Sequence, residues 1–252
     1  MFIDIIKNRI EQGNKTSKYP KEKVSLPKNY RGLPKINFDC SKEIVEECAE
    51  NCPQDAINVE NKSIDLRKCI FCGECERVSK GEFVKFTQKF EMGTTNENDL
   101  IIDGKNKIIE IEHIKEIKKL FGGSLSLRVI SAGGCNACES DINVLNTPVF
   151  DLSRFGINFA ASPRHADGLL IVGPVTKSMV YALKKAYEAI PNPKVVIASG
   201  TCALSGGVFR DNKEQLNGVK NLFKVDLFVP GCPPHPMTLL HALITFFKKE
   251  IK

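Results

Sequence analysis

The stretch Gly133-Gly134-Cys135-Asn136-Ala137-Cys138-Glu139 directly follows an apolar run, Leu127 to Ala132. The run predicts a buried strand, and the two glycines predict a turn at its carboxyl end. Two thiols on such a turn form half of a site that binds metal through four thiolates. Two single cysteines elsewhere in the chain qualify for the other half, Cys202 and Cys232, each close to a glycine.

The C-terminal half alternates apolar, β-rich runs with helical patterns. The runs expected as strands are 127–132, 157–161, 168–172, 194–198 and 225–229, and the helical patterns cover 177–190 and 236–249. This alternation predicts an α/β domain over residues 123–252, with a doubly wound parallel sheet of the flavodoxin-like kind.

Three of the cysteines, Cys135, Cys202 and Cys232, each stand a few residues past the carboxyl end of a predicted strand. Ligands of open α/β sheets bind at this edge. We therefore expect three loops to bring Cys135, Cys138, Cys202 and Cys232 together as ligands of one [4Fe-4S] cluster. A nucleotide site is the competing interpretation. It is disfavoured because no GxGxxG motif occurs at this strand end and no P-loop motif occurs in the chain.

A second cysteine motif is Cys69-Ile70-Phe71-Cys72-Gly73-Glu74-Cys75, with Cys52-Pro53 upstream. In bacterial-type ferredoxins, CxxCxxC supplies three ligands of one cluster and the Cys-Pro of the other half-motif supplies the fourth. The same rule assigns Cys52, Cys69, Cys72 and Cys75 to a second [4Fe-4S] cluster. A structural zinc site is the weaker alternative, since CxxCxxC with a distant Cys-Pro is more typical of a cubane.

A further ferredoxin ligand set is incomplete. The half-motif that ends at Cys52 needs cysteines at positions 48, 45 and 42, and these hold Cys48, Val45 and Lys42. Its cross-over partner at position 79 is Ser79, and Cys40 is out of register. We therefore expect two ferredoxin pseudo-repeats with a single cluster, and Cys40 and Cys48 as leftover thiols, paired or free.

These motifs divide the chain into four parts. Residues 1–35 form an arm whose amphipathic helix, 2–11, either packs on its own domain or docks on a partner or a membrane surface. Residues 36–91 form a small α+β ferredoxin-like domain, with a hairpin of 56–59 and 62–66 and a strand at 82–86. Residues 92–122 are polar and turn-rich, which predicts a linker ending in a short helix, 108–120. Residues 123–252 form the α/β domain.

Composition narrows the function classes. The formal net charge of +6 comes from scattered lysines, which favours a solvated surface over nucleic-acid binding. No apolar run approaches 18 residues and the N-terminus lacks a signal peptide's apolar core, so neither a transmembrane segment nor export is expected. The ten cysteines stand at ligand-like spacings, which favours intracellular metal sites over disulfides.

Several ordered motifs carry a resemblance to a known family: Gly134-Cys135-x-x-Cys138-Glu139, Ser162-Pro163-Arg164-His165-Ala166-Asp167, Gly173-Pro174-Val175-Thr176, Gly200-Thr201-Cys202-Ala203-x-Ser205-Gly206-Gly207 and Pro230-Gly231-Cys232-Pro233-Pro234. Together they resemble the small subunit of membrane-bound, energy-converting [NiFe] hydrogenases. They are also similar to the related complex I subunit that carries the terminal cluster beside the quinone site. The spacing Cys135-x-x-Cys138 favours the hydrogenase side, because the complex I subunits usually have adjacent cysteines there.

The first half resembles the two-cluster ferredoxin subunit of the same complexes, through Tyr19-Pro20-x-Glu22, Leu26-Pro27 and Arg31-Gly32-x-Pro34. The chain thus looks like a fusion of the two subunits that has lost one cluster's ligands. The resemblance places Arg164 and His165 near the cluster, against the alternative of an ordinary surface loop. It also places Glu139 near the interface with the large subunit, where the resemblance implies an acidic residue with a role in proton movement. The alternative is a glutamate that is favoured only by its position at a helix N-terminus.

The function that the resemblance implies is electron transfer. The chain would be a subunit, without catalysis of its own, of a group 4-type [NiFe]-hydrogenase-like complex of the formate hydrogenlyase or energy-converting kind. Its implied partners are a large subunit, other subunits of a membrane complex and a soluble donor such as ferredoxin, on the cytoplasmic, inner face of the membrane. The alternatives are a complex I-like quinone or methanophenazine module and a stand-alone iron-sulfur redox sensor or adaptor. The large subunit, its nickel content, the donor and the direction of electron flow stay open.

Overall fold

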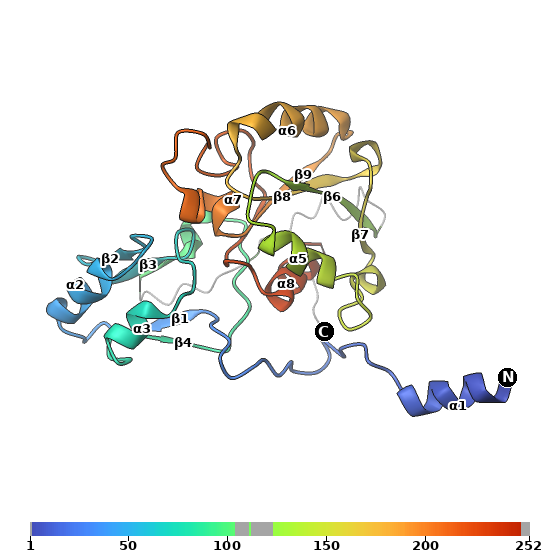
Figure 1. Cartoon of the computed structure of the whole chain (residues 1–252), viewed down its shortest axis with the longest axis horizontal. Helices are drawn as coiled ribbons and strands as arrows, with labels where there is room; N and C mark the ends of the chain where they lie inside the picture. Colours follow the sequence, from blue (N-terminus) through green and yellow to red (C-terminus); the bar gives the residue numbers. More distant parts are fainter. Residues whose placement is uncertain (1, 104–110, 112–122, 248–252) are drawn as a thin grey trace.

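Five parallel strands form the central sheet of the C-terminal half (Figure 1). The computed structural model describes residues 2–103, 111 and 123–247. Along the sheet the order is β10-β9-β8-β6-β7, which is the flavodoxin-like order of doubly wound folds. The predicted fold class is therefore confirmed. The strands are β6 (Leu125–Ser131), β7 (Ile157–Phe159), β8 (Gly168–Val172), β9 (Val195–Ser199) and β10 (Leu227–Val229).

Helices cover both faces of this sheet, with α6 on one face and α5 and α8 on the other (Figure 1). Successive residues along a strand point to opposite faces of the sheet. Leu170 and Val172 of β8 belong to the core that contains α5 and α8, whereas Leu169 and Ile171 pack with Leu183 of α6. A strand buried on both faces explains the continuous apolar runs of the sequence. The main helices are α5 (Ala137–Val144), α6 (Lys177–Ala189) and α8 (Pro236–Phe247).

Short helical turns fill the connections at the carboxyl edge of the sheet and between its strands. They are α7 (Thr201–Ser205), η2 (Leu152–Phe155), η3 (Pro163–His165) and η4 (Gly207–Phe209). Of these, α7 begins directly after β9 and therefore lies at the edge where ligands of such sheets bind.

Within the described residues of the first half, the part that follows the N-terminal arm contains two small antiparallel sheets and two α-helices. One sheet pairs β1 (Pro34–Ile36) with β4 (Val84–Phe86), so the strand predicted at 82–86 meets the end of the N-terminal arm. The other has the order β2-β3-β5 and contains the predicted hairpin. Its strands are β2 (Ile57–Asn58), β3 (Ser63–Asp65) and β5 (Ile101–Ile102), and the helices are α2 (Lys42–Glu50) and α3 (Glu74–Val78).

The described part of the segment predicted as a linker, 92–103, is packed against both halves. Its strand β5 pairs with β3, and Leu100 in η1 (Glu97–Leu100) is fully buried. Thr94 forms a bridge with Phe228 of β10. The polar residues that suggested a free connection are used in local hydrogen bonds, such as Asn98 N–H to the Asn96 side chain. Apart from residue 111, the short helix expected over 108–120 lies outside the described residues.

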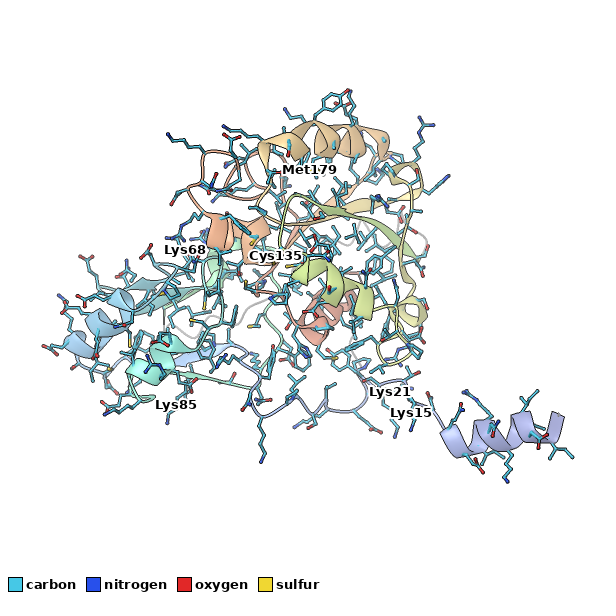
Figure 2. All side chains as sticks on the ribbon, in the orientation of Figure 1. Lys15, Lys21, Lys68, Lys85, Cys135 and Met179 are labelled. Atoms are coloured by element: carbon cyan, nitrogen blue, oxygen red, sulfur yellow. The ribbon has the colours of Figure 1, made fainter. Side chains whose placement is uncertain are left out.

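The N-terminal arm starts with α1 (Phe2–Gln12), which extends away from the rest of the molecule (Figure 1). The predicted amphipathic helix is confirmed, and Ile3, Ile5, Ile6 and Ile10 are all exposed. Figure 2 marks the following stretch of the arm by Lys15 and Lys21. Within the described ranges, no helix has both the length and the apolar character needed to cross a membrane.

Candidate metal centres

The turn that carries Cys135, between β6 and α5, contains two residues with positive φ. Gly133 has φ 91°, and a side chain there would lie 2.4 Å from the Thr176 methyl group, so only glycine fits. Asn136, with φ 70°, is the residue before α5. Cys138 consequently stands in the first turn of the helix, while Cys135, labelled in Figure 2, is exposed on the turn itself.

The structure brings Cys135, Cys138, Cys202 and Cys232 together, and we call this group the sheet-edge site. Each pair of these thiols interacts electrostatically. Burial, and then the other three cysteines and Glu139, raise the pKa of the Cys138 thiol. The pKa of Cys202 is raised to about 11, mainly by burial and then by Cys232 and Cys135. Thiolates held this close need a compensating positive charge, which a metal centre provides.

Glycines leave the space around these sulfurs open. A Cβ atom at Gly200 would lie 2.7 Å from the Cys138 sulfur, and one at Gly207 would lie 2.7 Å from the Cys202 sulfur. Gly200 and Gly207 both have positive φ, at 91° and 53°. Any side chain at these positions would collide with a cysteine sulfur of the sheet-edge site, so this arrangement depends on glycine.

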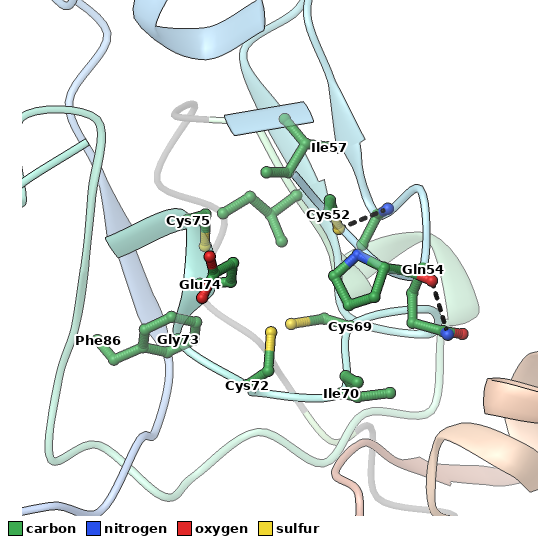
Figure 3. Close-up of a pocket in the computed structure, with 13 residues that line it drawn as sticks. Cys52, Gln54, Ile57, Cys69, Ile70, Cys72, Gly73, Glu74, Cys75 and Phe86 are labelled. Carbon is green, nitrogen blue, oxygen red and sulfur yellow. Dashed lines mark hydrogen bonds between the residues drawn. The ribbon is translucent and has the colours of Figure 1, made fainter. Parts of the chain in front are cut away.

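The second group, Cys52, Cys69, Cys72 and Cys75, lines one pocket and is called the ferredoxin-like site (Figure 3). The pKa of Cys69 is raised to about 12 by burial first; the Phe71 N–H lowers it, and the charges of the other three thiols raise it. The pKa of Cys75 is raised to about 12, again mainly by burial. The remaining wall of the pocket is largely apolar, with Ile57, Ile64, Ile70 and Phe86.

Backbone N–H groups point at the sulfurs of both sites. Ala56 N–H donates to the Cys52 sulfur and Phe71 N–H donates to the Cys69 sulfur, each over 3.4 Å. The Val208 N–H donates to the Cys202 thiol and lowers its pKa, opposing the effect of burial. Such donors stabilise negative charge on cluster sulfur and raise the reduction potential of an iron-sulfur centre.

A single metal ion and an iron-sulfur cluster make different demands on the thiols of each site. Among the described residues, which include all ten cysteines, no three His, Cys, Asp or Glu side chains are arranged to hold one ion. A tetrahedral zinc site with Zn–S bonds of about 2.3 Å needs sulfurs about 4 Å apart. A cubane is a larger body whose four corners reach sulfurs that are farther apart. The two all-thiol donor sets, of four cysteines each, are of the chemical kind that holds [4Fe-4S] clusters.

Most of the residues at the incomplete ferredoxin ligand positions are buried in the protein. Val45 and Cys48 are fully buried on the same side of α2, and Cys40 is also buried. The Cys48 thiol donates to the Cys75 carbonyl over 3.4 Å, and the Ser79 hydroxyl donates to the same carbonyl over 2.7 Å. The leftover thiols are thus part of a packed core behind the ferredoxin-like site.

Glu139 is the one predicted neighbour of the sheet-edge site that the structure places there. Its charge acts on both Cys138 and Cys202. Its Oε1 atom is buried, and within the described residues it has no hydrogen-bond partner. Arg164 and His165 lie in η3 between β7 and β8, and both side chains are exposed. Their proximity to a cluster stays a prediction.

Sequence reasoning missed two residues that contact the ferredoxin-like site. The Arg31 side chain lies against Gly73, where a Cβ atom would be 2.4 Å from the Arg31 Nε, and its Nη1 donates to the Phe71 carbonyl over 3.4 Å. The Thr201 hydroxyl donates to the Cys69 carbonyl over 3.0 Å. Both contacts join segments that are far apart in the chain, so no local sequence pattern predicts them.

Comparison with known proteins places this arrangement in a family. The profile described as NADH ubiquinone oxidoreductase, 20 Kd subunit, matches residues 135–246, and residues before 135 lie outside it. A probable membrane-bound hydrogenase subunit of Pyrococcus furiosus is 39% identical over 56% of this chain and 84% of its own length.

Two other relatives match over a smaller share of their length. Formate hydrogenlyase subunit 7 of Escherichia coli is 41% identical over 51% of this chain and 49% of its own length. An NADH-quinone oxidoreductase subunit of a Roseiflexus species is 44% identical over 46% of this chain and 44% of its own length. Given the profile match across the sheet-edge cysteines and the identity to the Pyrococcus furiosus subunit, the chain belongs to the NADH ubiquinone oxidoreductase 20 Kd subunit family.

Proposed function

We propose that this protein is an electron-transfer subunit that holds two [4Fe-4S] clusters. Cys135, Cys138, Cys202 and Cys232 would hold the first, and Cys52, Cys69, Cys72 and Cys75 the second. Each cluster would supply one-electron redox chemistry at its site. The observation that carries the proposal is the pair of complete thiol sets, on halves of the chain that contact each other through Thr201 and Cys69.

The protein's own contribution would be to bind, shield and tune these centres. Cys69 and Cys75 are half-buried and Cys202 is buried, which limits the access of water from one side of each site. Backbone N–H groups stabilise the thiolates, and exposed Cys72 and Cys135 leave each site accessible on its other side. Electrons can therefore enter at one site and leave at the other while the centres stay inside the protein.

The complex that we propose is of the [NiFe]-hydrogenase type. Two of the relatives are named as subunits of a membrane-bound hydrogenase and of formate hydrogenlyase. The spacing Cys135-x-x-Cys138 also favours this type. The partners would be a large subunit at the sheet-edge site, further subunits of a membrane complex and a soluble donor such as ferredoxin, at the inner, cytoplasmic face of the membrane.

A complex I-like module that passes electrons to a quinone or to methanophenazine is the second candidate. It is supported by the Roseiflexus relative, which is named as part of an NADH-quinone oxidoreductase. Affinity purification of the tagged chain from its native membranes distinguishes the two. A co-purifying large subunit with about one nickel per complex supports the hydrogenase assignment. A large subunit without nickel supports the quinone module. Recovery of the chain by itself contradicts both and favours a redox sensor or adaptor.

A further inference from the structure

Helix α7 contacts both metal sites. Thr201 and Ser205 are four residues apart and therefore lie on one face of the helix. The Ser205 hydroxyl donates to the Arg67 carbonyl over 2.7 Å, and the Thr201 hydroxyl donates to the Cys69 carbonyl over 3.0 Å. Cys202, between them, belongs to the sheet-edge site. One short helix therefore carries a ligand of one site and two hydrogen bonds to the loop of the other.

Thr201 also contacts the third loop of the sheet-edge site. Its N–H donates to the Gly231 carbonyl over 2.8 Å, and its hydroxyl lies 3.1 Å from the same carbonyl. Gly231 directly precedes Cys232. The side chain is 1% exposed, so water does not compete for these contacts. The single hydroxyl hydrogen is shared between the carbonyls of Cys69 and Gly231, as in a three-centre hydrogen bond.

We propose that Thr201 is the positioning residue that fixes the two ligand sets relative to each other, and that its hydroxyl provides the shortest bonded connection between them. The connection runs from the Cys69 carbonyl through one hydrogen bond to the Thr201 side chain and then along the backbone to Cys202. This inference rests on the proposed function, because it concerns how two redox centres exchange an electron. When one electron passes, one site is oxidised and the other is reduced by the same amount.

The hydrogen bonds of Thr201 and Ser205 to the first half differ, so the effects of losing each can be measured separately. Ser205 binds the carbonyl of Arg67, which is not a ligand, and also lies 3.3 Å from the Thr201 carbonyl within the helix. Loss of its hydroxyl removes an interdomain contact but leaves the Cys69–Thr201–Cys202 connection intact. Ser205→Ala is therefore the matched control. Thr201→Val removes the hydroxyl at nearly constant volume, and Thr201→Ser restores it.

The experiment uses the full chain with its clusters reconstituted anaerobically. We expect Thr201→Val to keep the iron content of the wild type. Amide exchange of residues 69–71 should rise roughly tenfold, the factor for one buried hydrogen bond of about 1.4 kcal/mol. The magnetic interaction between the two reduced centres in the EPR spectrum should weaken, and electron exchange between them after a laser-induced reduction should slow. Thr201→Ser should restore all three values, and Ser205→Ala should change the amide exchange alone.

The outcomes separate this inference from the proposed function. Suppose that every variant holds two centres, and that Thr201→Val leaves their magnetic interaction and electron exchange unchanged. This result would overturn the role of Thr201 but would leave the proposed function standing. Equal effects of Ser205→Ala and Thr201→Val would also overturn it, because interdomain packing in general would then be sufficient. A wild-type chain that binds no iron would overturn the proposed function itself. If Thr201→Val loses iron, Thr201→Ala removes the same hydroxyl without placing a methyl group against the carbonyl.

Discussion

Cys52 and Cys48 are close in sequence but stand in different surroundings. Cys52 lines the ferredoxin-like pocket, whereas Cys48 is fully buried behind it and donates to the Cys75 carbonyl. We expect Cys52→Ala to abolish the signal of the ferredoxin-like cluster as completely as Cys72→Ala. We expect Cys48→Ala to keep that signal and to lower the free energy of unfolding by about 1–2 kcal/mol, because a small cavity and a lost weak hydrogen bond result. EPR spectra and denaturant titrations of the reconstituted variants measure both effects, and the opposite ranking would refute the cross-over assignment.

Arg31 is the cation that packs on the CxxCxxC loop, against Gly73 and the Phe71 carbonyl. A positive charge beside a cluster favours its reduced form. Arg31→Gln should therefore lower the midpoint potential of the ferredoxin-like centre, by an amount on the order of tens of millivolts, since the side chain is solvent-exposed and screened. The sheet-edge centre should not shift. Lys28→Gln, also an exposed cation of the arm, is the control, and an equal shift in that variant would mean that the effect is one of net charge only.

The N-terminal arm is attached to α8 by two tyrosines. The Tyr19 hydroxyl lies 2.6 Å from His241 Nδ1, and the Tyr30 hydroxyl lies 3.2 Å from the Thr238 hydroxyl. Burial lowers the pKa of His241, while nearby Glu91 raises it and Lys89 lowers it. The folded protein thus binds a proton at His241 less readily than the unfolded chain does.

This shift fixes the sign of a pH dependence. Stability from neutral His241 is present above its ordinary pKa of about 6.5 and is lost as the pH falls below that value towards the lower pKa of the folded state. We expect amide exchange of the arm around Tyr19 to accelerate when the pH falls from about 7.5 to about 5.5, after correction for intrinsic exchange rates. His241→Gln, which does not titrate, should remove this dependence. An unchanged dependence in that variant would assign it to another group.

The sequence allowed most strands and the helices α1, α6 and α8 to be predicted, because buried strands leave apolar runs and glycine turns mark their ends, whereas α2, α3, α5 and α7 were not predicted. β8 and β9 were found within a residue because every one of their side chains is buried. The grouping of the sheet-edge cysteines followed from their positions after three strands. Residues 92–103, predicted as part of a linker, pack against both halves, and their polar side chains bind one another and the backbone. Contacts across long sequence separations, such as Thr201 with Cys69, leave no periodic signal.

The two halves of the protein contact each other directly through side chains. Arg210 of the α/β half donates to the Gln54 carbonyl over 2.9 Å, and Lys220 pairs with Glu97 over 3.0 Å. The hydrophobic core on the α6 side of the sheet continues into the first half through residues such as Leu66 and Phe83. We therefore expect the two halves to be coupled in stability rather than independent.

Cys202→Ala tests this coupling. Loss of the sheet-edge cluster should loosen the three loops that it holds, because metal binding contributes to folding free energy. Through Thr201 and Ser205 the loosening should extend to residues 67–71, while α2, on the far side of the first half, should stay protected. Hydrogen exchange read segment by segment measures this. Protection lost only in the α/β half would contradict the coupling, and unchanged protection around residues 133–139 would mean that Cys202 is not a ligand.

The number of clusters is the quantity on which the proposed electron path depends. Iron, acid-labile sulfide and zinc should be measured per chain in the anaerobically reconstituted protein, with spin integration of its fully reduced EPR spectrum. Two four-cysteine cubane sites predict about eight iron and about eight sulfide, with about two unpaired spins and no zinc. About four iron would leave one site without a cluster and break the path between Cys69 and Cys202. Zinc in place of iron at either site would contradict the account altogether.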